Sequence, residues 1–356
     1  MTIPTTQRIS GPAELVQAIP YLLGFHPTRS LVLVGLDAGV LVVTARLDLP
    51  DVLGSDAVRD TVGAMAAGGA STLVAAVYDD APGLPASLDS VTAAARILAL
   101  LDVIAAAAER HGCDLLDALC VAHGRWRSAM CAGADCCPAD GEPLPDAPSA
   151  FAAAATVAGV VALPDRQSLA RSLEPAPLLE RSALLPAIAE AERAALAAGL
   201  GGQGAQHGRS AKRAIFAAAR AADTPGWAGL AAAQVARFAV SLADNSMRDA
   251  VWAAVDHGRL DGRPLWRELA RRAPAPYDAP PLLLFGWASW RAGDGALAGI
   301  AAERAVASDP SYSAADLLLG ALSCGVNPNR LPRLRSHGRG RASADGPGRA
   351  SADGRG

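Results

Sequence analysis

The sequence predicts an N-terminal α/β domain with a mixed sheet and helices, followed by an all-α domain. Short β-rich segments alternate with helical segments in the first part of the chain, as they do in layered α/β domains. Strand signals fade from about residue 149, where alanine-rich helical segments take over. The length of 356 residues also favours two domains over one. We therefore place an α/β domain at 1–147, a helical domain at 148–331 and a tail at 332–356.

The α/β domain is expected to start with a helix and a hairpin. Residues 11–25 place leucine and isoleucine side chains roughly on one helical face, and we expect Pro20 to kink or end this helix. Two β-rich runs follow at 31–36 and 40–47. They flank the three residues 37–39, which include a glycine, and this arrangement is typical of a β-hairpin.

The rest of this domain continues the alternation. We expect helices at 56–67 and 88–111, with a buried type of strand at 72–78 between them. Residues 118–123 and 125–131 are expected to form a second hairpin that leads into a cysteine-rich loop.

The helical domain contains a glycine-rich break at residues 199–208, which we expect to be a flexible loop. Further along, two helices are expected at 228–243 and 247–257. Asn245 and Ser246 lie between them and have side chains suited to capping a helix.

Residues 279–312 have the length and the small-residue pattern of one tetratricopeptide unit. Gly286 and Ala298 fall where the two helices of such a unit pack closely, and Gly293-Asp294 falls at its turn. An ordinary helical hairpin within a helical domain would show the same features. Both interpretations stay open, and only the first provides a groove for a peptide.

Five of the six cysteines lie between residues 113 and 137. Zinc prefers four nitrogen or sulfur ligands in a tetrahedral array. The spacing of Cys131 and Cys136 suits one pair of ligands, and Cys137 and His123 are the candidates that would complete the site. The paired C-x₂-C motif of many zinc sites is absent from the sequence. We therefore predict no cofactor, and zinc is the only cofactor that we keep as an alternative.

The cysteine loop has two other interpretations. It can be a thiol-redox site, in which Arg125 and Arg127 lower the pKa of a nearby thiol. Alternatively its cysteines only pack, as we expect for Cys120 on a buried strand, because a free cysteine behaves as a small apolar residue.

A second candidate site follows the strand at 72–78. Asp79 and Asp80 come directly after this strand, and ligand sites of α/β sheets gather at the carboxyl ends of strands. Two carboxylates there would bind a metal or share a proton, which makes them the candidate catalytic residues. Aspartate is also common in turns, so a simple loop start is the alternative. The G-x-S-x-G and H-E-x-x-H motifs of common hydrolases are absent from the sequence.

The charge of the chain argues against a nucleic-acid partner. The net charge is −3, whereas duplex-binding domains carry a clear basic excess. Residues 330–356 carry a net charge of +5 and contain a repeated segment without large apolar residues, so we expect a disordered tail. No secretory signal and no membrane-spanning stretch is visible, and we therefore expect a cytoplasmic protein with reduced thiols.

Four groups of segments are informative together: 19–27 with 30–35; 124–128 with Cys131 and 136–138; 163–166 with Leu169; and 293–297 with Ala305 and 309–310. They resemble an uncharacterised actinobacterial family, the domain of unknown function 4192, and the resemblance covers about residues 8–330. Arg127 departs from that pattern, in which an aromatic residue is expected. The resemblance implies an actinobacterial origin and agrees with the domain picture, but it implies no catalytic residues.

These observations favour a cytoplasmic, non-catalytic interaction or regulatory protein. Such a protein would bind a protein partner through its helical domain, in an exposed apolar groove near Trp287 and Trp290. One alternative is a zinc-stabilised or thiol-redox protein that uses residues 123–137, which requires its thiols to converge. The other is an enzyme with its site near Asp79 and Asp80, which requires a deep polar pocket at that edge of the sheet.

Overall fold

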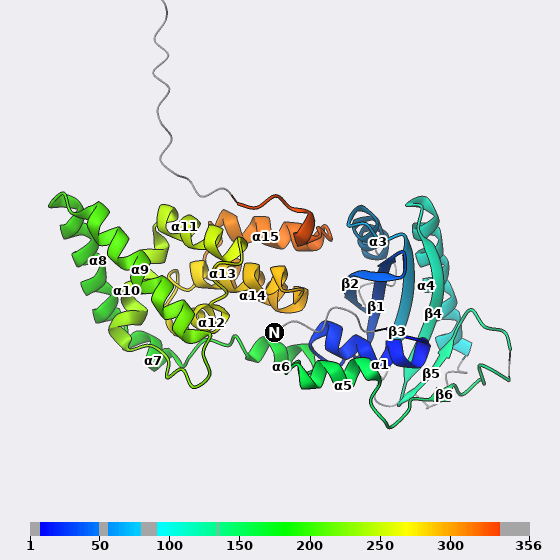
Figure 1. Cartoon of the computed structure of the whole chain (residues 1–356). Coiled ribbons are helices and arrows are strands. Elements are labelled where there is room, and N and C mark those ends of the chain that lie inside the picture. The colour runs from blue at the N-terminus through cyan, green and yellow to red at the C-terminus, as the bar shows by residue number, and fades with distance from the viewer. Residues whose placement is uncertain (1–7, 50–55, 80–90, 134, 335–356) are drawn as a thin grey trace, which may run out of the picture.

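The computed structural model of the chain describes residues 8–49, 56–79, 91–133 and 135–334. The molecule is elongated, with a sheet and its covering helices at one end and a purely helical part at the other (Figure 1). The predicted fold class is therefore confirmed for the described residues. The boundary at residue 148 stays a prediction, and residues 335–356 of the tail lie outside the described part.

A six-stranded mixed sheet forms the centre of the α/β part. Its strands are β1 (Ser30–Asp37), β2 (Val40–Asp48), β3 (Thr72–Tyr78), β4 (Asp114–Ala122), β5 (Arg125–Ser128) and β6 (Glu142–Pro143). They lie in the order β2-β1-β3-β4-β5-β6. Strands β3 and β4 are parallel, and the other neighbouring pairs are antiparallel.

Helices cover the sheet and build the rest of the molecule. They are α1 (Pro12–Leu23), α3 (Ala57–Ala67), α4 (Val91–Arg110), α5 (Ala150–Val157), α6 (Arg166–Arg171), α7 (Leu178–Ser182), α8 (Leu185–Leu200), α9 (Gly204–Ala222), α10 (Ala232–Ala243), α11 (Asn245–Asp256), α12 (Arg263–Arg272), α13 (Ala279–Arg291), α14 (Gly295–Ser308) and α15 (Ser313–Ser323), with a 3₁₀ turn at Pro328–Arg330. Among the described residues, no helix combines the length and the apolar character that a membrane span needs.

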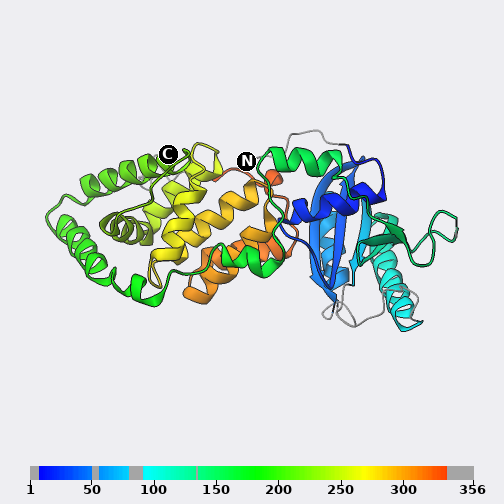
Figure 2. The same ribbon diagram turned by 90° about the horizontal axis from the view of Figure 1, so that it is seen from below.

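Each face of the sheet packs against different helices. On β1, Leu31 and Leu33 belong to the core that includes side chains of α3 and α4. Val32 and Val34 belong to the core on the other face, which includes side chains of α1. This division follows because successive side chains of a strand point to opposite faces. Figure 2 shows the strands between α1 on one side and α4 on the other.

The first hairpin is tighter than expected. Asp37 pairs with Val40, so the turn contains only Ala38 and Gly39 rather than three residues. Both turn residues have positive φ, at 48° and 78°, as a two-residue hairpin turn with the twist of its strands requires. Pro20 lies inside α1 and does not end it before Leu23.

The prediction of a flexible loop at 199–208 is wrong, because most of these residues are helical. Helix α8 runs to Leu200 and α9 begins at Gly204, so the turn is short and has its left-handed residue at Gly202 (φ 71°). A Cβ at Gly204 would lie 3.5 Å from the Cα of Gly199. This is an ordinary van der Waals distance, so the first turn of α9 lies in contact with the last turn of α8.

The capping residue of α11 also differs from the expected ones. Asp244 caps this helix, because its carboxylate accepts the backbone N–H of Met247 at 2.8 Å. Asn245 and Ser246 are the first two residues of the helix instead. Asp244, Asn245 and Ser246 all have side chains that can cap a helix. Asp244 is the cap because the first helical turn begins at the next residue.

Helices α13 and α14 form the hairpin expected at 279–312. A Cβ at Gly286 would lie 3.3 Å from the carbonyl oxygen of Ala298, which shows how closely the two helices approach. The membership of this hairpin in a repeat stays a prediction. The prediction of an exposed groove near Trp287 and Trp290 is wrong, because the side chains that would line it are buried, with only 7% and 5% of their surface exposed.

A C-terminal strap, residues 325–334, connects the two parts. Leu334 donates its backbone N–H to the buried carboxylate of Asp256 at 2.7 Å. Arg330 lies over Gly69, at the end of α3, where an added Cβ would collide with the guanidinium. The first residues of the predicted tail therefore pack against the helical part.

Candidate metal centre

The cysteine loop, residues 131–137, is held at its two ends by β5 and its neighbours. Before the loop, Ser128 donates a hydrogen bond to the Asp117 carboxylate on β4 at 2.6 Å. After the loop, Arg125 donates to the carbonyl oxygens of Asp140 and Gly141 at 2.8 and 2.6 Å. The chain therefore leaves β5 and returns along the same strand, which confines the loop between two fixed points.

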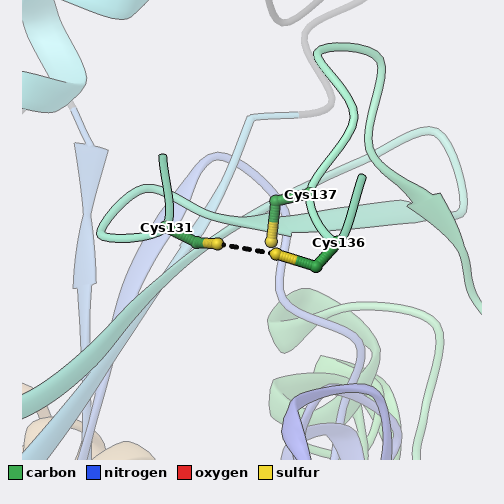
Figure 3. A group of neighbouring side chains, drawn as sticks. All are labelled: Cys131, Cys136 and Cys137. Carbon is green, nitrogen blue, oxygen red and sulfur yellow. Dashed lines mark hydrogen bonds between the residues drawn. The ribbon is translucent and has the colours of Figure 1, made fainter. Parts of the chain in front are cut away.

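A tight turn inside the loop brings the cysteines together. The carbonyl oxygen of Gly133 accepts the backbone N–H groups of Cys136 and Cys137, at 3.3 and 2.8 Å. This turn places Cys136 and Cys137 opposite Cys131, as Figure 3 shows. A Cβ at Gly133 would lie only 2.9 Å from the Cys136 sulfur, so a larger residue there would displace that thiol.

Three sulfur atoms converge in this turn. Among the described residues, the ligand atoms of Cys131, Cys136 and Cys137 all lie within 4.8 Å of one another. The sulfur atoms of Cys131 and Cys136 are 3.0 Å apart, and the Cys137 sulfur points toward the same place (Figure 3). Cys136 is exposed and the other two are partly exposed, so a small ion or reagent reaches the group from solvent.

Hydrogen bonds among the thiols set their acidities apart. The pKa of Cys131 is lowered, chiefly because the Cys136 thiol donates to its sulfur. The pKa of Cys136 is raised to about 11, because its proton is held in that hydrogen bond. Cys131 is therefore the most readily ionised thiol of this pair, and a thiolate is the form that binds metals.

The arginines do not play the part expected of them at Cys131. Arg125 binds backbone carbonyls, and Arg127 donates to the carbonyl of Ala139 at 3.1 Å. Arg127 acts on the thiol of Cys120, whose pKa is nonetheless raised by burial. Both arginines position the returning chain, which is a structural role that the sequence pattern did not reveal.

His123 is not brought to the three thiols. It occupies the turn between β4 and β5 with φ 51°, and it lies outside the group of converging ligand atoms. The expected fourth ligand is therefore not supplied by this residue. The remaining cysteines are also separate, since Cys113 and Cys120 are buried in the core and Cys324 is exposed after α15.

A family model for a domain of unknown function, DUF4192, matches residues 12–329, which is most of the chain and includes the cysteine loop. The chain belongs to the DUF4192 family. The resemblance seen in the four groups of segments is thereby confirmed. No curated protein and no solved structure matches the chain.

Of the two candidate catalytic residues in this DUF4192 chain, Asp79 and Asp80, the structure describes only Asp79. Asp79 follows β3 directly and is partly exposed, with its backbone N–H 3.2 Å from the carbonyl oxygen of Val121. Asp80 lies outside the described residues, so the structure does not test the pair. Two cavities of the described part lie elsewhere, along α8, α9 and α10.

The larger of these cavities is an apolar cleft of about 520 Å³ between α8, α9 and α10. Alanine and glycine residues make up about half of its lining, and Met247 also lines it. This cleft was not predicted from the sequence. Its signal was the set of small residues around Gly204 and Gly208, which were assigned to a loop although they lie on a helix that faces α8.

Proposed function

We propose that this chain is a cytoplasmic zinc-binding regulatory or interaction protein, in which Cys131, Cys136 and Cys137 hold the ion. The support comes from one observation, the convergence of three sulfur atoms within 4.8 Å on a single loop. Thiolates are preferred ligands of zinc and of other thiophilic ions. A reducing compartment would keep these thiols free to bind it.

The spacing of the sulfur atoms is close to what zinc requires. Zn–S bonds are about 2.3 Å long, so two thiolates of a tetrahedral site lie about 3.8 Å apart. The sulfur atoms of Cys131 and Cys136 are 3.0 Å apart. Zinc therefore has to spread this pair by roughly 1 Å, and the exposed position of the loop leaves room for that movement.

The fourth ligand would come from outside the three cysteines. Since His123 lies apart from them, three protein ligands leave one position of a tetrahedral ion open. Water, or a donor atom of a partner molecule, would occupy this position. The open position gives the zinc site a direct way to take part in an interaction.

The helical part offers a second place for a protein partner. The buried tryptophans provide no groove, but the apolar cleft between α8, α9 and α10 is an alternative surface for such contacts.

Metal analysis of the purified protein tests the proposal. The full chain is purified under reducing conditions without a metal-affinity column, and zinc is measured by mass spectrometry beside a count of free thiols. We expect about one zinc per chain, because the three thiols form one site. Replacing Cys131 or Cys136 with serine should remove most of this zinc.

Cys324→Ser is the matched control, because Cys324 is also exposed but stands apart from the loop. This variant should retain its zinc. A wild-type protein that holds no metal after incubation with zinc and removal of the excess, with six free thiols counted after denaturation, would rule out the proposed site.

A further inference from the structure

We infer that the cysteine loop is also a redox switch, in which Cys131 and Cys136 close into a disulfide while Cys137 remains a thiol. The inference deepens the proposed function, because this disulfide would remove two of the three zinc ligands. The choice of the disulfide pair does not depend on zinc, since it follows from the loop geometry. The step that releases the ion rests on the proposed zinc site.

The positions of the sulfur atoms select the pair. The Cys131 and Cys136 sulfur atoms are in contact at 3.0 Å across the turn (Figure 3). A disulfide bond is about 2.05 Å long, so the two atoms have to approach by about 1 Å. Four residues separate the two cysteines, so the loop can adjust to this approach.

The adjacent pair, Cys136 and Cys137, is excluded by backbone geometry. Consecutive Cα atoms are about 3.8 Å apart across a trans peptide bond. The Cα atoms of disulfide-bonded cysteines usually lie about 4.4–6.8 Å apart. A disulfide between these two neighbours would therefore distort the loop. Since the Cys131 sulfur already contacts the Cys136 sulfur at 3.0 Å, Cys137 is the thiol that stays outside the bond.

Gly133 keeps the space that the pair needs. An added Cβ at this residue would lie 2.9 Å from the Cys136 sulfur and 3.7 Å from the Cys131 sulfur. The Cys136 thiol also lies 3.4 Å from the carbonyl oxygen of Gly133. Both sulfur atoms thus lie over a residue without a side chain, on the exposed side of the loop.

A peroxide is the class of oxidant that balances the reaction. One thiol of the pair attacks an oxygen of hydrogen peroxide and becomes a sulfenic acid, with one water released. The second thiol then attacks the sulfenic sulfur, and the S–O bond breaks as the S–S bond forms, releasing a second water. In sum, two thiols and one peroxide give one disulfide and two waters. If zinc holds the pair as thiolates, two protons from solvent complete the two waters, and the ion loses two of its ligands.

Peroxide treatment followed by two-step alkylation tests the pairing. Reduced full-length protein without metal is exposed to stoichiometric hydrogen peroxide, its free thiols are blocked with N-ethylmaleimide, and the disulfide is then reduced and labelled with iodoacetamide. The three cysteines lie on one tryptic peptide, residues 128–166, in which tandem mass spectrometry locates each label. We expect N-ethylmaleimide on Cys137 and the second label on Cys131 and Cys136.

Two variants sharpen this test. Cys137→Ser should still form the disulfide, whereas Cys136→Ser should lose it. A disulfide that includes Cys137, or equal labelling of the three cysteines, would overturn the inference. These experiments need no zinc, so a failure of the proposed zinc site would not alter their outcome.

Zinc release is measured separately on protein loaded with one zinc. A colorimetric chelator should detect loss of most of the zinc after peroxide, and its recapture after a thiol reductant is added and the excess removed. Peroxide that forms the disulfide without releasing zinc would contradict the switch. Absence of zinc from the start would instead contradict the proposed function and leave the disulfide pair intact.

Discussion

Several buried polar contacts meet at Asp256. Its carboxylate is fully buried and accepts hydrogen bonds from Trp287 at 3.0 Å, from Arg291 at 2.7 Å and from the backbone of Leu334 at 2.7 Å. Arg291 is itself only 8% exposed. The Asp256 carboxylate is the hydrogen-bond acceptor for all three of these donors. Removing this carboxylate would therefore leave the donors without a partner.

We expect Asp256→Ala to lower the free energy of unfolding by about 3–5 kcal/mol, because it leaves the Arg291 charge buried without a counter-ion. Urea unfolding followed by circular dichroism measures the change. Asp249→Ala is the matched control on the same helix, because the Asp249 side chain is 45% exposed in its contact with Arg248. The control should cost less than about 1 kcal/mol, and equal losses in the two variants would refute this account of Asp256.

Tyr277 provides a prediction about pH. Its hydroxyl donates a hydrogen bond to the Glu192 carboxylate on α8, and this bond, with some burial, raises the pKa of Tyr277 to about 12. The folded state therefore favours the protonated phenol. The resulting stability is present below the ordinary tyrosine pKa of about 10, and it is lost as the pH rises toward 12.

Melting temperatures of the wild type and of Tyr277→Phe, measured between pH 8 and pH 12, test this contact. The difference between the two proteins should be constant up to about pH 10 and should shrink above it. The effect should be small, because Tyr277 is only partly buried and solvent screens the interaction. A difference that does not change with pH would show that the hydrogen bond does not form in solution.

At the scale of elements, the close contact of α13 with α14 depends on one glycine. A Cβ at Gly286 would lie 3.1 Å from the Leu318 side chain and 3.3 Å from Ala301. Gly299, on α14, has no neighbouring atom within 4 Å of such a Cβ. The two glycines therefore differ in their effect. Gly286 leaves the space that a close helix contact needs, whereas Gly299 only lowers the stability of its own helix.

We expect Gly286→Leu to destabilise the protein by about 1–3 kcal/mol, because it overpacks the contact. Gly299→Ala should instead stabilise it by about 0.5–1 kcal/mol, because alanine restricts the unfolded chain and favours the helix. Chemical unfolding of both variants checks the pair of signs. Destabilisation by Gly299→Ala would mean that α14 has a neighbour at that face.

Most elements could be predicted because their patterns are local. The helix expected at 56–67 appears as α3, and the strand expected at 72–78 is β3. The glycines at 199–208 were misassigned, because a glycine at a helix contact looks the same in sequence as a glycine in a loop. Only the position of the neighbouring helix distinguishes these two kinds of glycine, and a local sequence pattern does not reveal that position.

The same limit applies to the site. The convergence of Cys131, Cys136 and Cys137 could be expected from their spacing, since they share one short loop. His123 was close in sequence but lies in the turn at the far side of β5, where the direction of the strand carries it away from the loop. Gly133 carries no chemical signal in the sequence, and its importance follows only from the space that the sulfur atoms occupy.

At the scale of the whole molecule, the C-terminal strap joins the helical part to the α/β part. Its residues bind Asp256 at one end and pack on Gly68 and Gly69 after α3 at the other. A Cβ at Gly68 would lie 2.9 Å from the carbonyl oxygen of Gly325. The strap therefore contributes to the stability of both parts, although it contains little regular structure.

Two truncations separate the strap from the tail. Removing residues 325–356 should lower the melting temperature by about 4 °C or more, because each lost kcal/mol costs roughly 2–4 °C in a domain of this size. Removing only residues 335–356 should leave it unchanged within about 1 °C, since the strap then stays in place. Equal melting temperatures for the two truncated proteins would contradict the role given to the strap.

X-ray absorption at the zinc edge, on the zinc-loaded full chain, tests the central claim most directly, because it counts the atoms bound to the metal. The account predicts three sulfur atoms at about 2.3 Å and one lighter atom at about 2.0 Å. In Cys137→Ser, the zinc that still binds should have only two sulfur neighbours. A spectrum with only nitrogen and oxygen ligands, or a chain that takes up no zinc, would contradict the proposal that these three thiols form a metal site.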